Sequence, residues 1–444
     1  MTSDTRPNAI LVAVKLPGQS DAELDASLSE LRRLVKTLGY HVAERVTQAR
    51  DSLSPAAVLG EGKLEELAKL TGGKGEIGPN AKKPKDKARA RRQPPEPESD
   101  AEPEIEPTIG LVAVDHEITP SQARNLERAT GVPVLDRAGV IIEIFHEHAK
   151  SREARLQVEI ARLTYTAPRI RESPSGKERQ RGRGAGEAGL ELDRRRIRDR
   201  IAELKEQLEA IQKEQSVRRS QRREARRVAL VGYTNAGKSS LMRALTLSLV
   251  HVEDKLFATL DTTVRALEPE AHPRILVSDT VGFIKKLPHD LVASFKSTLD
   301  EALEASLLIH LVDAADPSWE SQLEVTRSVL AEIGAGKVPS QLCFNKVDKI
   351  DADALGALRE RFSDAWFISA HAADDVSRVR EGIIAFFERS YVEAELFVPN
   401  SAQRLVAEMH EQGRVEEERY DERGVTVRVR TDPDTLARLR AELG

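Results

Sequence analysis

The sequence is poor in the residues that mark secreted, zinc-binding and membrane proteins. A single cysteine, Cys343, among 444 residues excludes an intramolecular disulfide and a cysteine-based zinc cluster. Aromatic residues make up only 4% of the chain, and no uncharged apolar run approaches the ~18 residues of a membrane span. The first residues have no signal-peptide layout. We therefore expect a cytoplasmic protein without integral membrane contact, and leave peripheral association with membranes open.

Charge, in contrast, is abundant and unevenly distributed. Charged residues make up 32% of the chain, and 73 acidic residues against 68 Lys and Arg give a net charge of −5. Between Ser151 and Arg227, 22 basic residues outnumber 13 acidic ones, so that this segment carries +9. A basic middle in an acidic chain predicts contact with an anionic partner.

The first block of the chain, residues 8–146, is predicted to be an N-terminal α/β domain. It is interrupted by residues 71–107, where seven prolines in 37 residues and blocks of like charge predict a disordered insertion. Strands and helices alternate on both sides of the insertion, which favours one domain. The expected strands are Ala9–Leu16, Gly110–Asp115 and Val140–Phe145, and the expected helices run through Leu24–Val35 and Pro120–Ala129.

Three further blocks follow. Residues 147–226 contain two apolar seams with helical spacing, Leu156–Leu163 and Ile197–Ile211, which predict a basic antiparallel helical hairpin with a glycine-rich tip. In residues 227–392, β-like runs alternate with helical patterns and predict a mostly parallel sheet flanked by helices. Residues 393–444 contain the alternating run VTVRVR and are predicted to form a small α+β appendage.

The most informative motif is the run Gly232-Tyr233-Thr234-Asn235-Ala236-Gly237-Lys238-Ser239, which fits G-x-x-x-x-G-K-[ST]. A buried-strand pattern precedes it and a helical pattern follows, which disfavours a chance glycine turn. In such a loop the backbone N–H groups converge on the β-phosphate of a nucleotide. Lys238 would neutralise β- and γ-phosphate oxygens, and Ser239 would offer its hydroxyl to Mg²⁺.

A second motif, downstream, predicts guanine as the base. Asn345, Lys346, Val347 and Asp348 end a predicted strand, and a carboxylate at Asp348 would accept hydrogen bonds from the N1–H and the exocyclic amine of guanine. The stem of Lys346 would lie over the base, and Asn345 would brace the neighbouring loops. Further on, the backbone N–H groups of Ser369-Ala370-His371 would meet the guanine carbonyl. Each motif is weak alone, and their order along the chain supports them together.

Between these motifs lie the residues expected to sense the terminal phosphate. Asp279 ends an apolar run and is followed by Thr280, Val281 and Gly282, so that Asp279 would reach Mg²⁺ through water and the Gly282 N–H would face the γ-phosphate. The stretch Leu256–Val264 is the expected switch loop. Thr259, Thr262 and Thr263 compete for the Mg²⁺ position, and we favour Thr259. The neighbouring residues expected at the nucleotide are Phe257, Ala258, Leu260 and Asp261.

Phe283 follows Gly282 at a position where many signalling GTPases carry a glutamine. A phenyl ring cannot orient the attacking water by hydrogen bonding. We therefore expect slow intrinsic hydrolysis that a partner accelerates.

Taken together, the runs GYTNAGKSSL, LFATLD, DTVGFI, NKVD and SAH resemble the HflX family of GTPases. Upstream, Leu59–Leu67, Ser121–Phe145, Arg152–Arg169 and Arg181–Ile201 are also similar to that family. The resemblance implies a cytosolic, Mg²⁺-dependent GTPase that binds the large ribosomal subunit and helps to split or rescue stalled ribosomes, with the hairpin tip directed towards ribosomal RNA. The family usually has proline at Thr262 and lysine at His371.

In this interpretation, the basic hairpin is expected to bind RNA. Arg181, Arg183, Arg194 and Arg195 are expected to contact RNA phosphates, which positions a protein without reading sequence. The alternative is a solvated helix face, because Glu191, Asp193 and Asp199 are interleaved with these arginines.

Two other functions remain open at this point. A ribosome-assembly or rRNA-maturation GTPase would use the same chemistry on another ribosomal state. A non-hydrolysing scaffold or membrane-associated regulator would use GTP only for stability. We expect a monomer in solution. Cys343 is predicted to be a buried thiol, Trp319 and Trp366 are predicted to be packing anchors, and no metal site is expected at His146 and His148.

Overall fold

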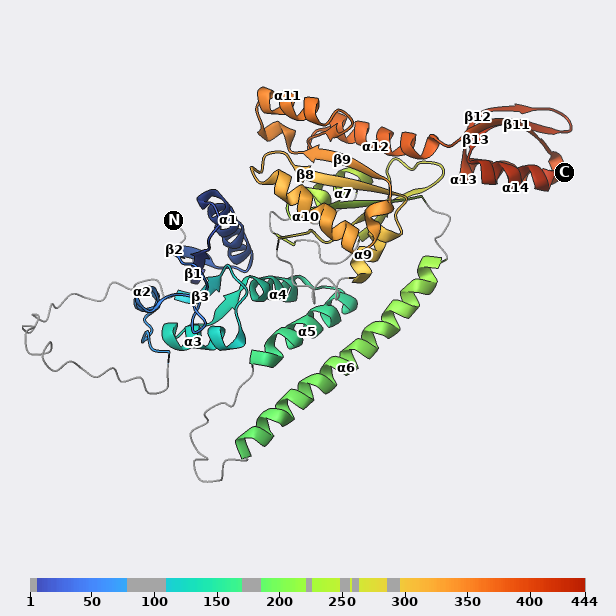
Figure 1. The fold of residues 1–444 in the computed structure, drawn as a ribbon. Coiled ribbons are helices and arrows are strands. Elements are labelled where there is room, and N and C mark those ends of the chain that lie inside the picture. The colour runs from blue at the N-terminus through green and yellow to red at the C-terminus, as the bar shows by residue number, and fades with distance from the viewer. Residues whose placement is uncertain are drawn as a thin grey trace, which may run out of the picture. The chain divides into compact units, whose positions relative to one another are not determined.

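The computed structural model describes residues 6–77, 109–169, 185–220, 226–247, 256–257, 263–285 and 296–443 (Figure 1). The chain divides into two compact units, Met1–Glu147 with Leu156–Glu206 and His148–Arg155 with Gln207–Gly444. The finer division into four domains stays a prediction.

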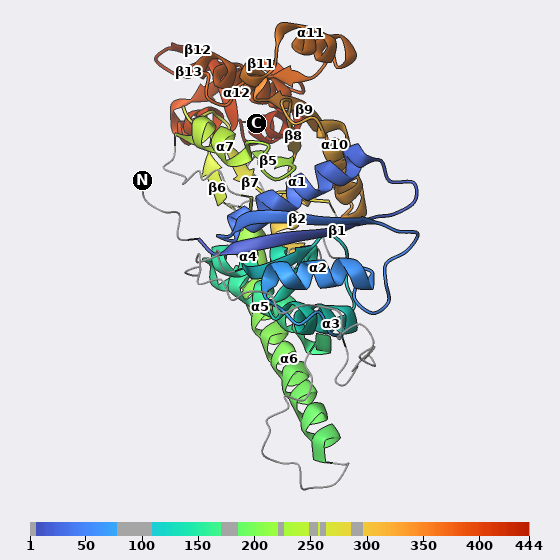
Figure 2. The same ribbon diagram turned by 90° about the vertical axis from the view of Figure 1, so that its left-hand side faces the viewer.

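The first unit contains a four-stranded parallel sheet in the order β2-β1-β3-β4. Helix α1 lies on one face of this sheet, and α2 and α3 lie on the other (Figure 2). β1 is buried along most of its length because both faces are covered. The elements are β1 (Asn8–Lys15), α1 (Asp21–Thr37), β2 (His41–Ala49), α2 (Glu61–Thr71), β3 (Ile109–Val114), α3 (Pro120–Thr130) and β4 (Val134–Asp136).

The run Val140–Phe145, expected as a strand, is instead part of helix α4 (Arg137–His148). Asp136 begins this helix, since its Oδ1 accepts a hydrogen bond from the Gly139 N–H at 2.8 Å. Most of α4 is buried, so the run has no polar stripe, and a short apolar run of this kind is compatible with either a strand or a helix. The prediction of a strand there was wrong.

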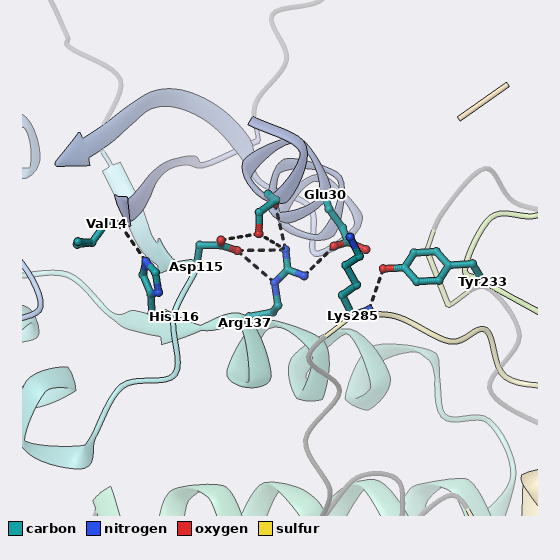
Figure 3. Close-up of polar contacts among 8 residues, drawn as sticks. Val14, Glu30, Asp115, His116, Arg137, Tyr233 and Lys285 are labelled. Carbon is teal, nitrogen blue, oxygen red and sulfur yellow. Dashed lines mark hydrogen bonds and ion pairs between the residues drawn. The ribbon is translucent and has the colours of Figure 1, made fainter. Parts of the chain in front are cut away.

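A buried ionic cluster ties α1, β3 and α4 together in the first unit (Figure 3). The Arg137 guanidinium lies 2.7 Å from Glu30 and 3.1 Å from Asp115, and all three side chains are almost fully buried. The Ser27 hydroxyl donates to Asp115 at 2.6 Å. Beside the cluster, His116 Nε2 accepts a hydrogen bond from the Val14 N–H at 2.9 Å, which joins the ends of β1 and β3.

Two helices occupy the basic stretch where a helical pair was expected. α5 (Arg152–Thr166) continues into a 3₁₀ turn (Ala167–Arg169), and α6 (Ala185–Ser220) is 36 residues long. In the first unit, Arg200 of α6 pairs with Glu159 of α5 at 3.1 Å. The predicted tip, with Arg181 and Arg183, lies outside the described residues, as does most of the predicted insertion 71–107.

The second unit contains a six-stranded sheet in the order β10-β9-β8-β5-β7-β6, in which only the β6–β7 pair is antiparallel. Helices α7 and α12 pack on one face, and α10 and α11 pack on the other. The elements are β5 (Arg226–Gly232), α7 (Lys238–Thr246), β6 (Thr263–Ala266), β7 (Ile275–Asp279), α9 (Lys296–Leu303), β8 (Leu307–Asp313), α10 (Trp319–Glu332), β9 (Ser340–Asn345), α11 (Ala352–Arg361), β10 (Trp366–Phe367) and α12 (Ala373–Glu388), with 3₁₀ turns at Ala335–Lys337 and Val347–Lys349.

A three-stranded antiparallel sheet follows in the same unit, in the order β11-β13-β12. Along β13, Val425, Val427 and Val429 are buried against α13 and α14, as the alternating run predicts. The predicted α/β fold class is thus confirmed. The elements are β11 (Val392–Pro399), a 3₁₀ turn (Asn400–Ala402), α13 (Arg404–Gln412), β12 (Gly413–Tyr420), β13 (Gly424–Thr431) and α14 (Pro433–Leu443).

Candidate nucleotide-binding site

The loop between β5 and α7 depends on two glycines that no larger residue can replace. Gly232 has φ +152°, and a Cβ there would lie 2.3 Å from the Leu311 carbonyl oxygen. Gly237 has φ +94°, and its Cβ would lie 2.1 Å from Asn345 Nδ2. The loop therefore packs directly on β8 and β9, and it leads into the N-terminus of α7, where an anion is favoured.

Lys238 lies beneath this loop with 6% of its surface exposed. Its ammonium donates to the carbonyl oxygens of Gly232 at 3.1 Å and Tyr233 at 2.9 Å. Burial lowers the pKa of Lys238 to about 8, against the opposing effect of the Asp279 carboxylate. The Lys238 ammonium is thus held in a fixed position at the loop.

The side-chain oxygens of Ser239 and Asp279 lie close to one another near this lysine. The Ser239 hydroxyl donates to Asp279 Oδ2 at 2.7 Å, which brings the start of α7 to the end of β7. Asp279 is 1% exposed. The Thr280 hydroxyl donates to the Leu230 carbonyl at 2.7 Å, so its side chain fixes β7 to β5.

The segment after Thr280 approaches the loop closely. A Cβ on Gly282 would lie 2.8 Å from Thr234 Cγ2 and 3.0 Å from Lys238 Nζ. The next residue, Phe283, forms a parallel bridge with Tyr233, and its side chain is only 3% exposed. Val281 is also buried.

Asn345 holds two of the predicted loops together. Its Nδ2 donates to the Ala236 carbonyl at 2.9 Å, and its Oδ1 accepts from the Ala370 N–H at 3.0 Å. One buried amide at the end of β9 therefore connects the 232–239 loop to the 369–371 loop.

Lys346 has φ +63° and extends along the edge of the loop. Its ammonium donates to the Asn235 carbonyl and to Asp313 Oδ2, both at 2.7 Å. Asp313 was missed by the sequence analysis. It ends the buried run Leu307–Val312, and an acidic residue directly after a buried strand is the signal that could have identified it.

The Asp348 side chain is an ionised carboxylate that can accept hydrogen bonds. A hydrogen bond from the Ser369 side chain lowers the pKa of Asp348, so the carboxylate is ionised at neutral pH. The N–H groups of Ser369 and Ala370 already donate within the protein, to Asp375 at 2.7 Å and to Asn345. These two groups would have to share or exchange those bonds to meet a guanine carbonyl. Asp375 was also missed by the sequence analysis.

For the other predicted residues, the structure gives either a position in the fold without a site contact or no description. Ala258, Thr259, Leu260, Asp261 and Thr262 lie outside the described residues. Phe257 has φ +58°, and its side chain is 3% exposed and therefore packed. Thr263 is the first residue of β6, and Val347 and His371 follow the ends of β9 and β10.

The remaining candidates behave as core or surface residues. Cys343 is buried, and Trp319 packs edge-on to Phe344 with ring centroids 5.3 Å apart, as predicted. Trp366 packs against the core that α7 and α12 cover. Within the described ranges, no group of three or more His, Cys, Asp or Glu could hold a metal ion, and no helix is long and apolar enough to cross a bilayer.

Family models match most of the chain. Residues 25–76 and 102–146 match the model described as GTP-binding GTPase N-terminal, and residues 148–222 match GTP-binding GTPase Middle Region. Residues 227–346, which include the 232–239 loop and the first part of the 345–348 motif, match the model described as 50S ribosome-binding GTPase.

Whole-length relatives agree with these matches. GTPase HflX of Gluconacetobacter diazotrophicus is 60% identical over 98% of this chain and 98% of its own length. GTPase HflX of Escherichia coli is 33% identical over 96% of this chain and 94% of its own length. A GTP-binding protein from Sulfolobus solfataricus, solved in complex with GDP, is 22% identical over 85% of this chain and 98% of that chain, with a TM-score of 0.42. The relatives, together with the match of residues 227–346 to a GTPase model, establish that the chain belongs to the HflX family of GTPases and hydrolyses GTP.

Proposed function

We propose that this GTPase binds the large ribosomal subunit and uses GTP and Mg²⁺ to split or rescue stalled 70S-type ribosomes. The proposal of GTP binding rests on one observation: the loops after β5, β7 and β9 converge at one edge of the sheet. Asn345, at the end of β9, is bonded to the loop after β5, and the Ser239–Asp279 hydrogen bond joins the end of β7 to the start of α7 after the same loop.

Base selection is assigned to Asp348. Its ionised carboxylate would accept the N1–H and the exocyclic amine of guanine, a pair of donors that adenine does not present in this geometry. Lys346 is fixed by Asn235 and Asp313, which supports its role as the aliphatic cover of the base plane.

Phosphate binding is assigned to the backbone of residues 232–237 and to Lys238. The lysine stays close to the loop carbonyls and would neutralise β- and γ-phosphate oxygens, while the Gly282 N–H would meet the γ-phosphate. Gly282 approaches Lys238 so closely that a side chain there has no room, which supports this placement.

The residues present fit a magnesium ion. The Ser239 hydroxyl and the Asp279 carboxylate are hard oxygen ligands whose oxygens lie 2.7 Å apart. Ser239 would hold the ion directly and Asp279 through water, with Thr259 as the expected switch-loop ligand. The bound ion would neutralise charge on the β- and γ-phosphate oxygens.

Hydrolysis by the chain alone is expected to be slow. Phe283 occupies the position after Gly282, and its buried ring carries no group that could orient a water by hydrogen bonding. A partner that orders the attacking water would therefore raise the rate, and the family description of residues 227–346 suggests that the partner is the large ribosomal subunit.

The decisive experiment is a sedimentation profile of purified 70S ribosomes incubated with the protein. We expect free subunits with GTP and intact ribosomes with GDP. The Lys238→Ala variant, which loses the buried cation, serves as the inactive control. An alternative function, ribosome assembly or rRNA maturation, predicts binding to free subunits or their precursors and no conversion of 70S ribosomes.

The assignment of Asp348 makes a separate prediction. Asp348→Asn should weaken GTP binding by about a hundredfold, because a charged acceptor of two hydrogen bonds is worth roughly 3 kcal/mol. The preference for guanine over adenine nucleotides should be lost with it. Competition titration with GDP and ADP measures both, and Asp351→Asn in the same loop is the matched control. An unchanged preference in Asp348→Asn would contradict the assignment.

A further inference from the structure

The nucleotide loop makes a side-chain contact with the segment that follows Gly282. The Tyr233 hydroxyl accepts a hydrogen bond from the Lys285 backbone N–H at 2.8 Å (Figure 3). Tyr233 is the second residue of the loop, and its side chain is 4% exposed. A buried phenol in a phosphate-binding loop therefore reaches past the loop to hold a main-chain group.

This contact adds to a main-chain bridge at the same place. The Phe283 N–H donates to the Gly232 carbonyl at 3.2 Å, and the Thr234 N–H donates to the Phe283 carbonyl at 2.8 Å. The bridge fixes Phe283 against the loop, and the Tyr233 hydroxyl fixes the chain two residues later. The segment is thus held at two successive points on the C-terminal side of Gly282.

The two points lie next to the residue that is proposed to sense the γ-phosphate. Gly282 lies between the loop and Lys238, where a Cβ would come within 3.0 Å of the lysine nitrogen. The position of its N–H relative to Lys238 depends on how firmly residues 283–285 are held. A buried hydrogen bond holds a backbone group only while both partners are present.

We propose that Tyr233 is a positioning residue that fixes the Gly282 N–H for the γ-phosphate by anchoring the main chain at Lys285. The inference rests on the proposed role of residues 232–239 and Gly282 in GTP binding. The hydroxyl acts on the γ-phosphate only through the chain, so GDP binding, which uses the loop backbone and Lys238, does not depend on it.

The test is the Tyr233→Phe variant, which keeps the ring and the main-chain bridge and removes only the hydroxyl. Affinity for a non-hydrolysable GTP analogue should fall about fivefold, the factor expected for one net hydrogen bond, while affinity for GDP changes less than twofold. Single-turnover hydrolysis should fall by at least the same factor. Tyr420→Phe removes an exposed phenol hydroxyl in the C-terminal sheet and is the matched control.

Amide hydrogen exchange provides a readout that does not depend on nucleotide chemistry. In Tyr233→Phe, the Lys285 amide should exchange faster than in the wild-type protein, and in Tyr420→Phe it should not. Equal exchange at Lys285 in Tyr233→Phe and the wild-type protein overturns the proposal, as does an equal loss of affinity for GDP and the GTP analogue.

These outcomes distinguish a failure of the proposed GTPase function from a failure of the proposed role of Tyr233. If the wild-type protein itself bound no guanine nucleotide, the proposed function would fail, and the exchange rate at Lys285 would still decide whether Tyr233 anchors the segment. If the wild-type protein bound and hydrolysed GTP and Tyr233→Phe did so equally well, only the role of Tyr233 would fail.

Discussion

At the scale of single residues, the buried cation at Lys238 links nucleotide binding to pH. Burial places its pKa at about 8, so the free protein loses the ammonium proton in mildly alkaline solution. Phosphate oxygens attract the charged form only. kcat/KM for GTP reports the titration of the free enzyme and should fall as pH rises through about 8.

The control for this profile is Lys238→Arg, because a guanidinium keeps its proton throughout the range. The difference between the two profiles isolates the lysine from any titration of the nucleotide. A wild-type kcat/KM that ran parallel to that of the variant from pH 7 to 9 would show that burial does not lower the pKa of Lys238.

His310 of β8 is another buried titratable group of the second unit. Burial, reinforced by the positive charges of Arg327 and Lys238, lowers its pKa to about 3. Its Nε2 is buried without a hydrogen-bond partner in the part of the chain that the structure describes. The folded protein therefore holds a neutral imidazole, whereas the unfolded chain takes up a proton below pH 6.5.

Because the unfolded state binds the additional proton, His310 lowers the free energy of unfolding as pH falls below 6.5, by about 1.4 kcal/mol between pH 7.5 and 5.5. In His310→Leu this contribution should vanish. Urea unfolding followed by tryptophan fluorescence measures it, since Trp319 and Trp366 are the two tryptophans of the chain and both lie in the six-stranded sheet domain. Equal pH dependence in the two proteins would refute the assignment.

Candidate site residues that belong to a sequence motif can be predicted from the sequence. Residues outside the motifs that bond to motif residues are missed. Lys238 begins α7, Asp279 and Asn345 end β7 and β9, and Asp348 lies in the turn after β9, in the expected order. Asp313 and Asp375 are not part of any motif, because an ion pair with Lys346 and a bond to the Ser369 N–H arise only when separate loops fold together.

At the scale of elements, the C-terminal appendage is joined to β5 through the start of α14. Asp432 accepts from the Thr435 N–H at 3.0 Å and the Thr435 hydroxyl at 2.8 Å, and it pairs with Arg226 of β5 at 3.1 Å. Burial raises the pKa of Asp432, but the hydrogen bonds from Thr435 and the charge of Arg226 outweigh it and lower the pKa overall. The carboxylate thus caps a helix and makes an ion pair.

Two substitutions separate these roles. Asp432→Ala should lower the free energy of unfolding by about 1–2 kcal/mol, since it removes the helix cap and the ion pair. Asp432→Ser keeps a capping oxygen and should lose only the smaller ion-pair part. Chemical denaturation followed by circular dichroism compares them. Equal losses in the two variants would show that the cap contributes nothing.

Elements with a clear periodic pattern are predictable, whereas α4, β2, α2 and β4 of the first unit were missed. Two of these failures, at α4 and β2, have clear physical causes. Helix α4 is buried on most sides and so lacks the polar stripe that identifies a helix. Strand β2 was not predicted, because it is an edge strand in which Val46 is the one buried residue and no apolar run results. In both cases the tertiary environment, rather than local pattern, decides the structure.

At the scale of the whole molecule, the proposed ribosome contact depends on arginines of α6. Arg194 and Arg195 are exposed, and Arg195 lies 4.0 Å from Asp199, which is at the limit of an ion pair. Arg200 is instead held by Glu159 and Glu203. The first two side chains are therefore available to RNA phosphates, and the third is engaged within the protein.

Replacing Arg194 and Arg195 together by alanine should weaken binding to large subunits and reduce the slope of log affinity against log salt by about 1.5, the value for two phosphate contacts. The Arg200→Ala variant should leave that slope unchanged. Binding measured by co-sedimentation over a salt series tests both. A double variant with the wild-type slope would favour the alternative of a solvated helix face.

The buried thiol has a practical consequence for spectroscopy. Cys343 is the only cysteine of the chain, and its side chain is fully buried. Burial and the nearby Asp375 carboxylate raise the pKa of the thiol above its usual value, which disfavours the reactive thiolate. The wild-type chain should consequently remain unlabelled by maleimide dyes or spin labels. A pair of surface cysteines, one introduced on each compact unit, could then report distances between the units during the GTP cycle without first removing a native thiol.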